Sequence, residues 1–128
     1  MDRLGIFLFL LHLAVSAYIL LGWAIPSTRH LMFYLVLLPA VAMQWLVNRS
    51  SCVINNIETW VRTGRWRDAA NPEEGRFVSM LIFWLFGVRL NRTGMDTLCY
   101  STIIALWFLA LAHLAVLGDQ RLLSLFPR

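Results

Sequence analysis

Three long apolar runs dominate the pattern of hydrophobic and polar positions along the chain. Residues 4–25 carry no charged side chain, and a helix of that length is about 33 Å long, enough to cross a hydrocarbon core of about 30 Å. The run is also too long for the apolar part of a cleaved signal peptide, so we expect the helix to be retained. Residues 31–47 and 97–117 form two further runs, about 25 Å and about 32 Å long as helices. The pattern predicts three transmembrane helices.

Two shorter segments have a different pattern. In residues 52–63 the apolar positions recur at helical spacing, and Asn, Glu, Thr and Arg occupy the other side. This pattern predicts an amphipathic helix lying on the membrane surface. Residues 72–86 follow Asn71 and begin with a proline, which is typical of a helix start. Only about 18 Å of helix fits between the flanking arginines, so we expect an interfacial or re-entrant helix. Both helices are expected on the cytoplasmic side.

The number of spans depends on residues 77–88. If this segment crossed the membrane, the protein would have four spans instead of three. The positive-inside rule places the N-terminus in the cytoplasm in both topologies, because both put eight arginines inside and three outside. The short length of the segment favours three spans. In that topology the cytoplasmic arginines are Arg3, Arg49, Arg62, Arg65, Arg67, Arg76, Arg89 and Arg92.

Composition excludes a soluble domain. Hydrophobic residues make up 59% of the 128 residues, above the roughly 45–50% of soluble domains. All eleven basic residues are arginine, the net charge is +4, and the arginines flank apolar runs. This arrangement indicates anionic lipid headgroups as partners and not nucleic acid, since nearly every aromatic residue lies in or beside an apolar run.

Two histidines, His12 and His113, lie within the first and last spans. An imidazole in hydrocarbon needs a partner, which makes intramembrane histidines candidates for a functional site. One reading is a hydrogen bond to a neighbouring helix, with no cofactor required. The other is axial ligation of a tetrapyrrole, haem or bacteriochlorophyll. With three spans the two histidines are expected at different depths, so they cannot hold one haem together.

The sequence gives little support for catalysis or for a metal centre. Cys52 and Cys99 do not have metal-ligand spacing. A thiol enzyme at Cys52 is a further alternative, with Glu58 the nearest acid in sequence, but no histidine lies close to it. We expect no catalytic residue, and the two cysteines are expected to be small interior residues.

Tryptophan and arginine alternate around the second span end and the amphipathic helix. Such residues suit the headgroup layer, where a ring sits beside cations. We interpret them as a membrane anchor or, alternatively, as a docking surface for acidic groups of a partner. The residues in this set are Trp45, Arg49, Trp60, Arg62, Arg65, Trp66 and Arg67.

The first half of the chain carries a spaced set of residues: His12, Gly22, Pro26, Pro39, Trp45, Cys52, Glu58 and Arg62. With this set, the chain resembles a family of small bacterial inner-membrane proteins whose function is not known. The resemblance implies a membrane-embedded fold in the bacterial inner membrane but no activity. The family's Cys-Pro-Leu-Thr run is replaced here by Cys52-Val53-Ile54-Asn55.

These observations predict a single all-α membrane domain over residues 1–128, with three spans and two interfacial helices. A chain with no soluble domain, no row of pore-lining charges and only three spans is too small to enclose a channel. We therefore expect an accessory or assembly subunit of a larger membrane protein complex, not an enzyme. A tetrapyrrole-binding subunit using His12 or His113 is the alternative.

Overall fold

The protein is built from helices. The computed structural model describes residues 3–48, 52–66 and 77–124, and the regular structure within these ranges is helical throughout. The helices are α1 (Arg3–Leu21), a 3-10 turn η1 (Gly22–Ala24), α2 (Thr28–Val47), α3 (Val53–Thr63), α4 (Phe77–Phe86) and α5 (Arg92–Ser124). Three segments in the described ranges are long and apolar enough to cross a membrane, namely α1 with η1, α2, and α5. The all-helical class and these three apolar helices are confirmed. The helix start expected at residue 72 lies outside the described residues.

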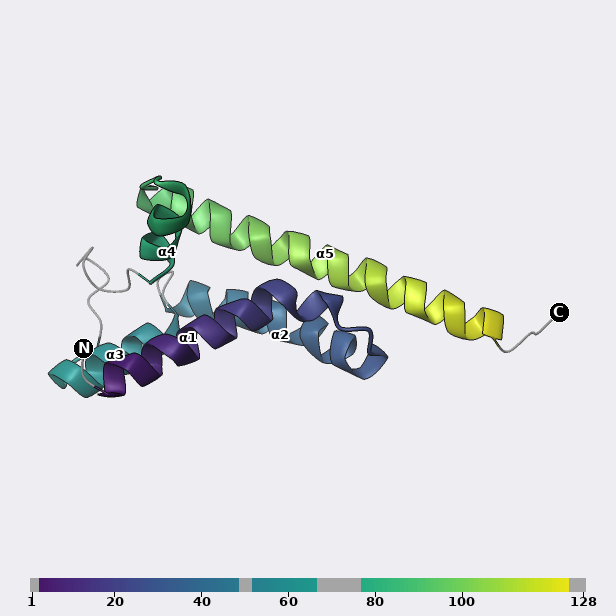
Figure 1. Ribbon diagram of the computed structural model, residues 1–128, viewed down its shortest axis with the longest axis horizontal. Coiled ribbons are helices and arrows are strands. Elements are labelled where there is room, and N and C mark those ends of the chain that lie inside the picture. Colours follow the sequence, from purple (N-terminus) through teal and green to yellow (C-terminus); the bar gives the residue numbers. More distant parts are fainter. Residues whose placement is uncertain (1–2, 49–51, 67–76, 125–128) are drawn as a thin grey trace.

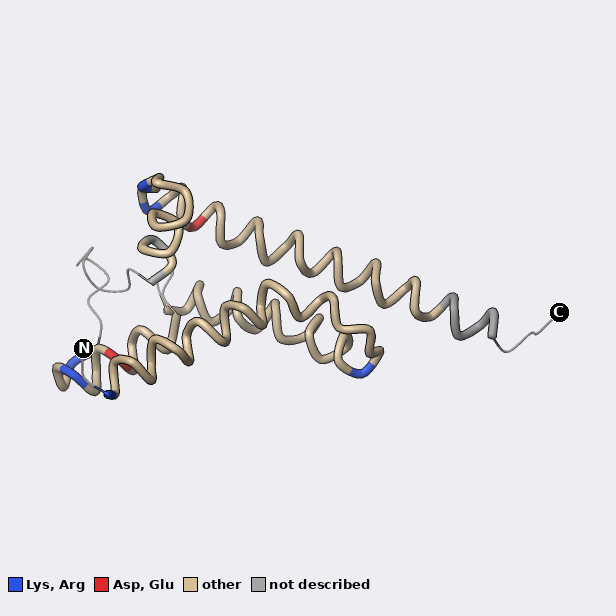
Figure 2. The backbone as a smooth tube through the Cα atoms, viewed as in Figure 1, with Lys and Arg blue, Asp and Glu red and all other residues tan. Residues whose placement is uncertain are grey.

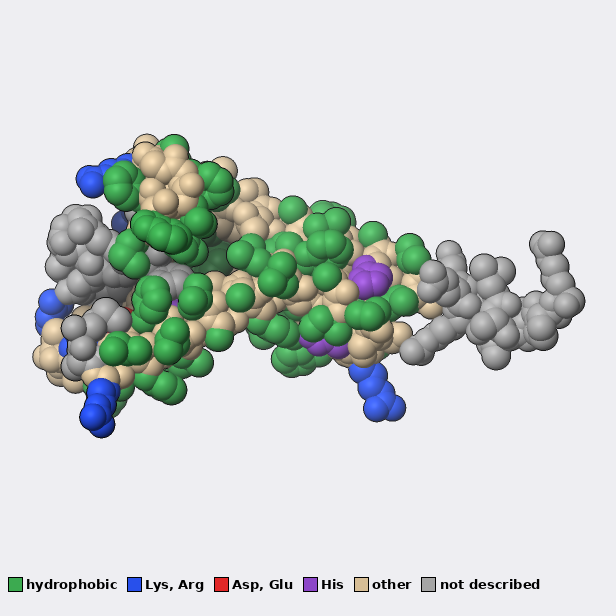
Figure 3. Space-filling view, in the orientation of Figure 1, with side chains coloured by type: hydrophobic (Ala, Val, Ile, Leu, Met, Phe, Trp, Pro, Cys, Tyr) green, Lys and Arg blue, Asp and Glu red, His purple; other side chains and the backbone are tan. Residues whose placement is uncertain are grey.

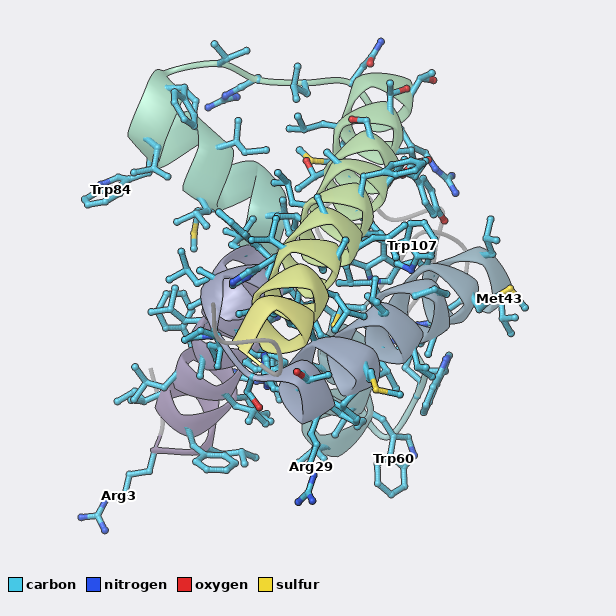
Figure 4. All side chains as sticks on the ribbon, turned by 90° about the vertical axis from the view of Figure 1, so that its right-hand side faces the viewer. Arg3, Arg29, Met43, Trp60, Trp84 and Trp107 are labelled. Carbon is cyan, nitrogen blue, oxygen red and sulfur yellow. The ribbon has the colours of Figure 1, made fainter. Side chains whose placement is uncertain are left out.

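The three long helices lie side by side (Figure 1). α1 and α2 form a hairpin closed by η1 and the following turn, and α5 packs against α2 and η1 and extends beyond them. α3 lies along the amino-terminal half of α1. α4 is seen nearly end-on in Figure 1 and from the side in Figure 4, so its axis lies across the long axis of the bundle.

The core of the bundle is the contact between α2 and α5. On each helix the buried side chains are spaced by three and then four residues, which places them on one face. The small side chain of Ala110 allows the two backbones to approach closely, as is common between membrane helices. The buried residues of this α2–α5 seam are Leu31, Tyr34 and Leu38 of α2 and Ile103, Leu106 and Ala110 of α5.

Pro39 lies inside α2 and has no N–H, so the carbonyl of Leu35, four residues earlier, loses its helical partner. The indole Nε1–H of Trp107 on α5 donates to this carbonyl at 3.0 Å. In a membrane a freed carbonyl must find a partner inside the protein, because there is no water to provide one. The proline in α2 and the tryptophan in α5 are therefore a matched pair.

The turn after α1 is closed by two ring side chains of α2. Tyr34 donates a hydrogen bond to the carbonyl of Ile19, and His30 Nε2 donates to the carbonyl of Gly22 at 2.9 Å. These carbonyls belong to the last turn of α1 and to η1, where intrahelical donors run out. Gly22 is required here, because a Cβ at this position would lie 2.7 Å from Tyr34 Cε2.

The ends of the shorter helices and of α5 follow from their sequence. α3 ends at Gly64 and α4 ends before Gly87, and both glycines have positive φ, which favours glycine at this position. α5 begins earlier than the expected residue 97, because the Asn91 side chain caps it by accepting from the N–H of Gly94 at 2.8 Å. It also continues past the expected end at 117, since Gly118 remains helical. A single glycine weakens a helix by only about 1 kcal/mol and does not have to end it.

Among the described residues, charged side chains are concentrated at one end of the molecule. Figure 2 shows arginines at the tip of α3, at the start of α1 and around the α4–α5 connection, and one arginine at the opposite turn between α1 and α2. The described arginines at the first end are Arg3, Arg62, Arg65, Arg89 and Arg92, and the one at the opposite turn is Arg29. Between the two ends, apolar side chains cover much of the visible face (Figure 3).

Candidate functional site

His12 is part of a polar contact between α1 and α3. Its ring lies in an otherwise apolar helix and is only 5% exposed. It forms a hydrogen bond with the side chain of Asn55, near the start of α3. A polar side chain from another helix thus meets the imidazole, as an intramembrane histidine requires.

Asn56 extends this polar contact to the end of α2. Its side chain is 1% exposed and its Nδ2 donates to Oδ1 of Asn48, the residue that follows α2. Buried amides are stable only when they are hydrogen-bonded, so these pairs fix how α3 sits against the other helices. We refer to His12, Asn48, Asn55 and Asn56 as the polar cluster.

The polar cluster shows how α3 is turned. The amphipathic pattern predicted a helix on the membrane surface, without indicating which of its sides would face the other helices. In the structure Asn55 and Asn56 face the bundle, whereas the apolar side chains are exposed. Figure 4 shows Trp60 pointing away from the other helices. The exposed apolar residues of α3 are Val53, Ile57, Trp60 and Val61. When Asn55 and Asn56 face the bundle, their amide groups form hydrogen bonds with His12 and Asn48. Apolar side chains in the same place could not form these bonds, which explains the orientation of α3.

His113, a residue of α5, lies beside the carboxyl end of α1. Its Nδ1 donates to the carbonyl of Trp23 in η1 at 2.8 Å. Along α1, Trp23 is about 16 Å from His12, so the two histidines lie at different levels of the bundle. This separation matches the expectation for three spans, and in this arrangement a tetrapyrrole would have to be held by one of the two histidines alone.

The cysteines are half-buried and are not paired with each other. Burial raises the pKa of the Cys52 thiol, so less of it is in the reactive thiolate form at neutral pH. Among the described residues, no group of three His, Cys, Asp or Glu side chains is placed to hold a metal ion.

The predicted anchoring residues fall into three groups. Trp60, Arg62, Arg65 and Trp66 are exposed around the end of α3, and Arg62 pairs with Glu58, its Nε lying 3.1 Å from Oε1. Trp45 is half-buried and packs edge-on against Tyr100 of α5, so it also contributes to the bundle interior. Arg49 and Arg67 lie outside the described residues.

Sequence analysis missed the donors that bind backbone carbonyls: Tyr34, His30 and Trp107. Pro26 and Pro39 were visible signals that carbonyls would be freed. The identity of each donor depends on which helices meet, and Trp107 lies 72 residues from its acceptor. The sequence could have suggested that a histidine or tryptophan inside an apolar run donates to a carbonyl freed by a proline. It could not have shown which donor meets which carbonyl.

Comparisons with protein-family models, with curated proteins and with solved structures gave no match.

Proposed function

We propose that the protein is a small accessory subunit of a larger membrane protein complex and that α4 docks on its partners. The observation that supports this proposal is the state of α4. Its ten residues are apolar apart from one serine, and as a helix they measure about 15 Å, half of what a span needs.

A surface-bound helix keeps a polar side for water, and α4 has none. A helix that is apolar all round is normally covered on all sides. Within the described residues, however, the largest side chains of α4 remain uncovered, and Trp84 is 81% exposed. Figure 4 shows Trp84 pointing away from the rest of the molecule. A protein partner that covers α4 would remove this apolar surface from the headgroup layer.

The distribution of charge supports an orientation for the complex. Five of the six arginines whose side chains are described lie at the end that carries α4, and the sixth is Arg29. By the positive-inside rule this end faces the cytoplasm, together with the N-terminus. The resemblance of the first half suggests the bacterial inner membrane. Labelling of cysteines with an impermeant reagent tests the orientation: Arg29→Cys should react from outside intact cells, and Arg92→Cys should not. The reverse pattern would overturn it.

The docking role is tested by site-specific photo-crosslinking and by the mass of the intact particle. A photo-reactive amino acid at Trp84 should give a discrete crosslink to another protein in native membranes. The same amino acid at Phe33, which is exposed on α2, serves as the control and should give mainly lipid adducts. In mild detergent the particle should be larger than this chain with its micelle. A monomeric particle, or lipid adducts alone at Trp84, would refute the proposal. The absorption spectrum of the same particle tests the tetrapyrrole alternative, which requires a Soret band that is lost in His12→Ala or His113→Ala.

A further inference from the structure

We infer that α3 lies within the membrane beside α1 and that its exposed apolar face binds lipid acyl chains. The first observation is its inverted amphipathic pattern. The side of α3 that faces the bundle carries Asn55 and Asn56, and the side that faces outward carries Val53, Ile57 and Val61. Water around α3 would favour the opposite arrangement, because each exposed apolar side chain would cost free energy.

The second observation is depth. The distance from the arginines at the charged end to the His12–Asn55 contact can be estimated along two different helices. His12 is about 14 Å from Arg3 along α1, and Asn55 is about 11 Å from Arg62 along α3. The start of α3 also contacts the end of α2, because Asn56 bonds to Asn48, and α2 is about 30 Å long from Thr28 onward. α3 therefore begins at the boundary of the hydrocarbon core and runs toward the arginines at the headgroup level.

The third observation is the character of the two ends of α3. Its carboxyl end carries the Glu58–Arg62 pair and is followed by Arg65 and Trp66, which suit the headgroup layer. Its amino end carries the polar cluster, where the amides and His12 satisfy one another. Charges lie at the outer end and neutral polar groups at the inner end, as expected for a helix that enters the membrane.

Acyl chains are the occupant that these observations favour. The exposed apolar residues recur along the length of α3, and the exposed Arg62 already has Glu58 as its partner, so α3 needs no matching charge on another protein. On the neighbouring α1, Phe7 and Leu11 are also exposed. This inference does not depend on α4, because it concerns the other side helix of the molecule.

Spin labels on α3 in lipid bilayers test the inference. Both native cysteines are replaced by alanine, and single labels are placed at Ile57 and Val61. Collisions with oxygen, which concentrates in hydrocarbon, are compared with collisions with a water-soluble nickel complex. We expect both labels to favour oxygen over the nickel complex, as a label at Val36, which is exposed on the apolar surface of α2, should also do. A label at Arg65 should favour the nickel complex.

Two outcomes would overturn the inference. Collision with the nickel complex at Ile57 that equals the value at Arg65 would place the face of α3 in water. Weak collision with both reagents would mean that protein covers it. A second variant, His12→Leu, tests the inward side: loss of the polar contact should increase the mobility of the label at Ile57 and leave the label at Val36 unchanged. An unchanged label at Ile57 would show that the polar cluster does not hold α3 in place.

Discussion

α2 and α4 are both apolar helices, but only one of them is packed. In α2 the buried face is covered by α5, and even the carbonyl freed by Pro39 has a donor in Trp107. In α4, by contrast, Met80, Phe83, Trp84, Leu85 and Phe86 are exposed. Apolar composition thus predicts that a helix will be covered, but it does not indicate what covers it. For α2 the covering element is within the chain, and for α4 we look for it outside.

The largest expected effect is the removal of a ring from the α2–α5 seam. Tyr34 is fully buried and also donates to the carbonyl of Ile19, so Tyr34→Ala should lower the free energy of unfolding by about 3–5 kcal/mol. Phe33→Ala is the matched control, since Phe33 is the neighbouring residue and is 59% exposed. The loss there should be about 0.5 kcal/mol or less. Unfolding by SDS in mixed micelles, followed by circular dichroism, measures both, and equal losses would contradict the packing of this seam.

A smaller loss is expected from adding one methyl group at Gly22. The new Cβ would lie 2.7 Å from Tyr34 Cε2, and the buried ring has no room to move away. Gly22→Ala should therefore destabilise the protein by about 1–3 kcal/mol. Gly118→Ala is the control, because a Cβ there has nothing within 4 Å. It should be neutral or stabilising by up to about 1 kcal/mol, as expected for glycine inside a helix. The same unfolding assay applies, and a harmless Gly22→Ala would show that η1 is not tightly packed.

A double-mutant cycle tests the pairing of Pro39 with Trp107. Trp107→Phe keeps an aromatic ring but removes the donor to Leu35, and it should cost about 0.5–1.5 kcal/mol. In a Pro39→Ala background the N–H of residue 39 can satisfy that carbonyl, so the same change should cost less. A coupling energy of about 0.5 kcal/mol or more between the two sites is expected. Strictly additive losses would mean that the indole N–H does not compensate for the proline.

The smallest effect on stability is expected in α4. Trp84 is exposed and points away from the other helices, so Trp84→Ala should change the free energy of unfolding of the isolated chain by no more than about 0.5 kcal/mol. A loss above about 1 kcal/mol would indicate that α4 packs on its own chain. The contrast between α2 and α4 would then disappear, and with it the support for docking through α4.

Much of the architecture could be predicted from local pattern. Run length was sufficient to find the three long apolar helices, because crossing a hydrocarbon core sets a minimum length. Glycines at positive φ marked the ends of α3 and α4. The cap of α5 at Asn91 was not predicted, because the helix was expected to begin at residue 97 with its apolar run. Chain pattern finds elements well, and it locates their ends to within a few residues.

The contacts between helices were harder to predict from the sequence. His113 bonds to a carbonyl 90 residues away, and the choice of Trp23 as acceptor depends on how α5 is aligned with η1. The orientation of α3 was not predicted either, since periodicity shows that two faces differ but not which one turns inward. The orientation of α3 is set by the contacts of His12 with Asn55 and of Asn56 with Asn48. Residue spacing alone does not predict these contacts.

The bond between Trp107 and Leu35 has a consequence for how the protein is made. α2 leaves the ribosome before α5, so the carbonyl freed by Pro39 has to wait for its donor. During that interval the carbonyl would have to bond to water or to a polar group of the insertion machinery, since acyl chains offer no donor. The arrival of α5 therefore supplies the missing hydrogen-bond donor to α2. This couples the release of the α1–α2 hairpin into the bilayer to the synthesis of the last helix.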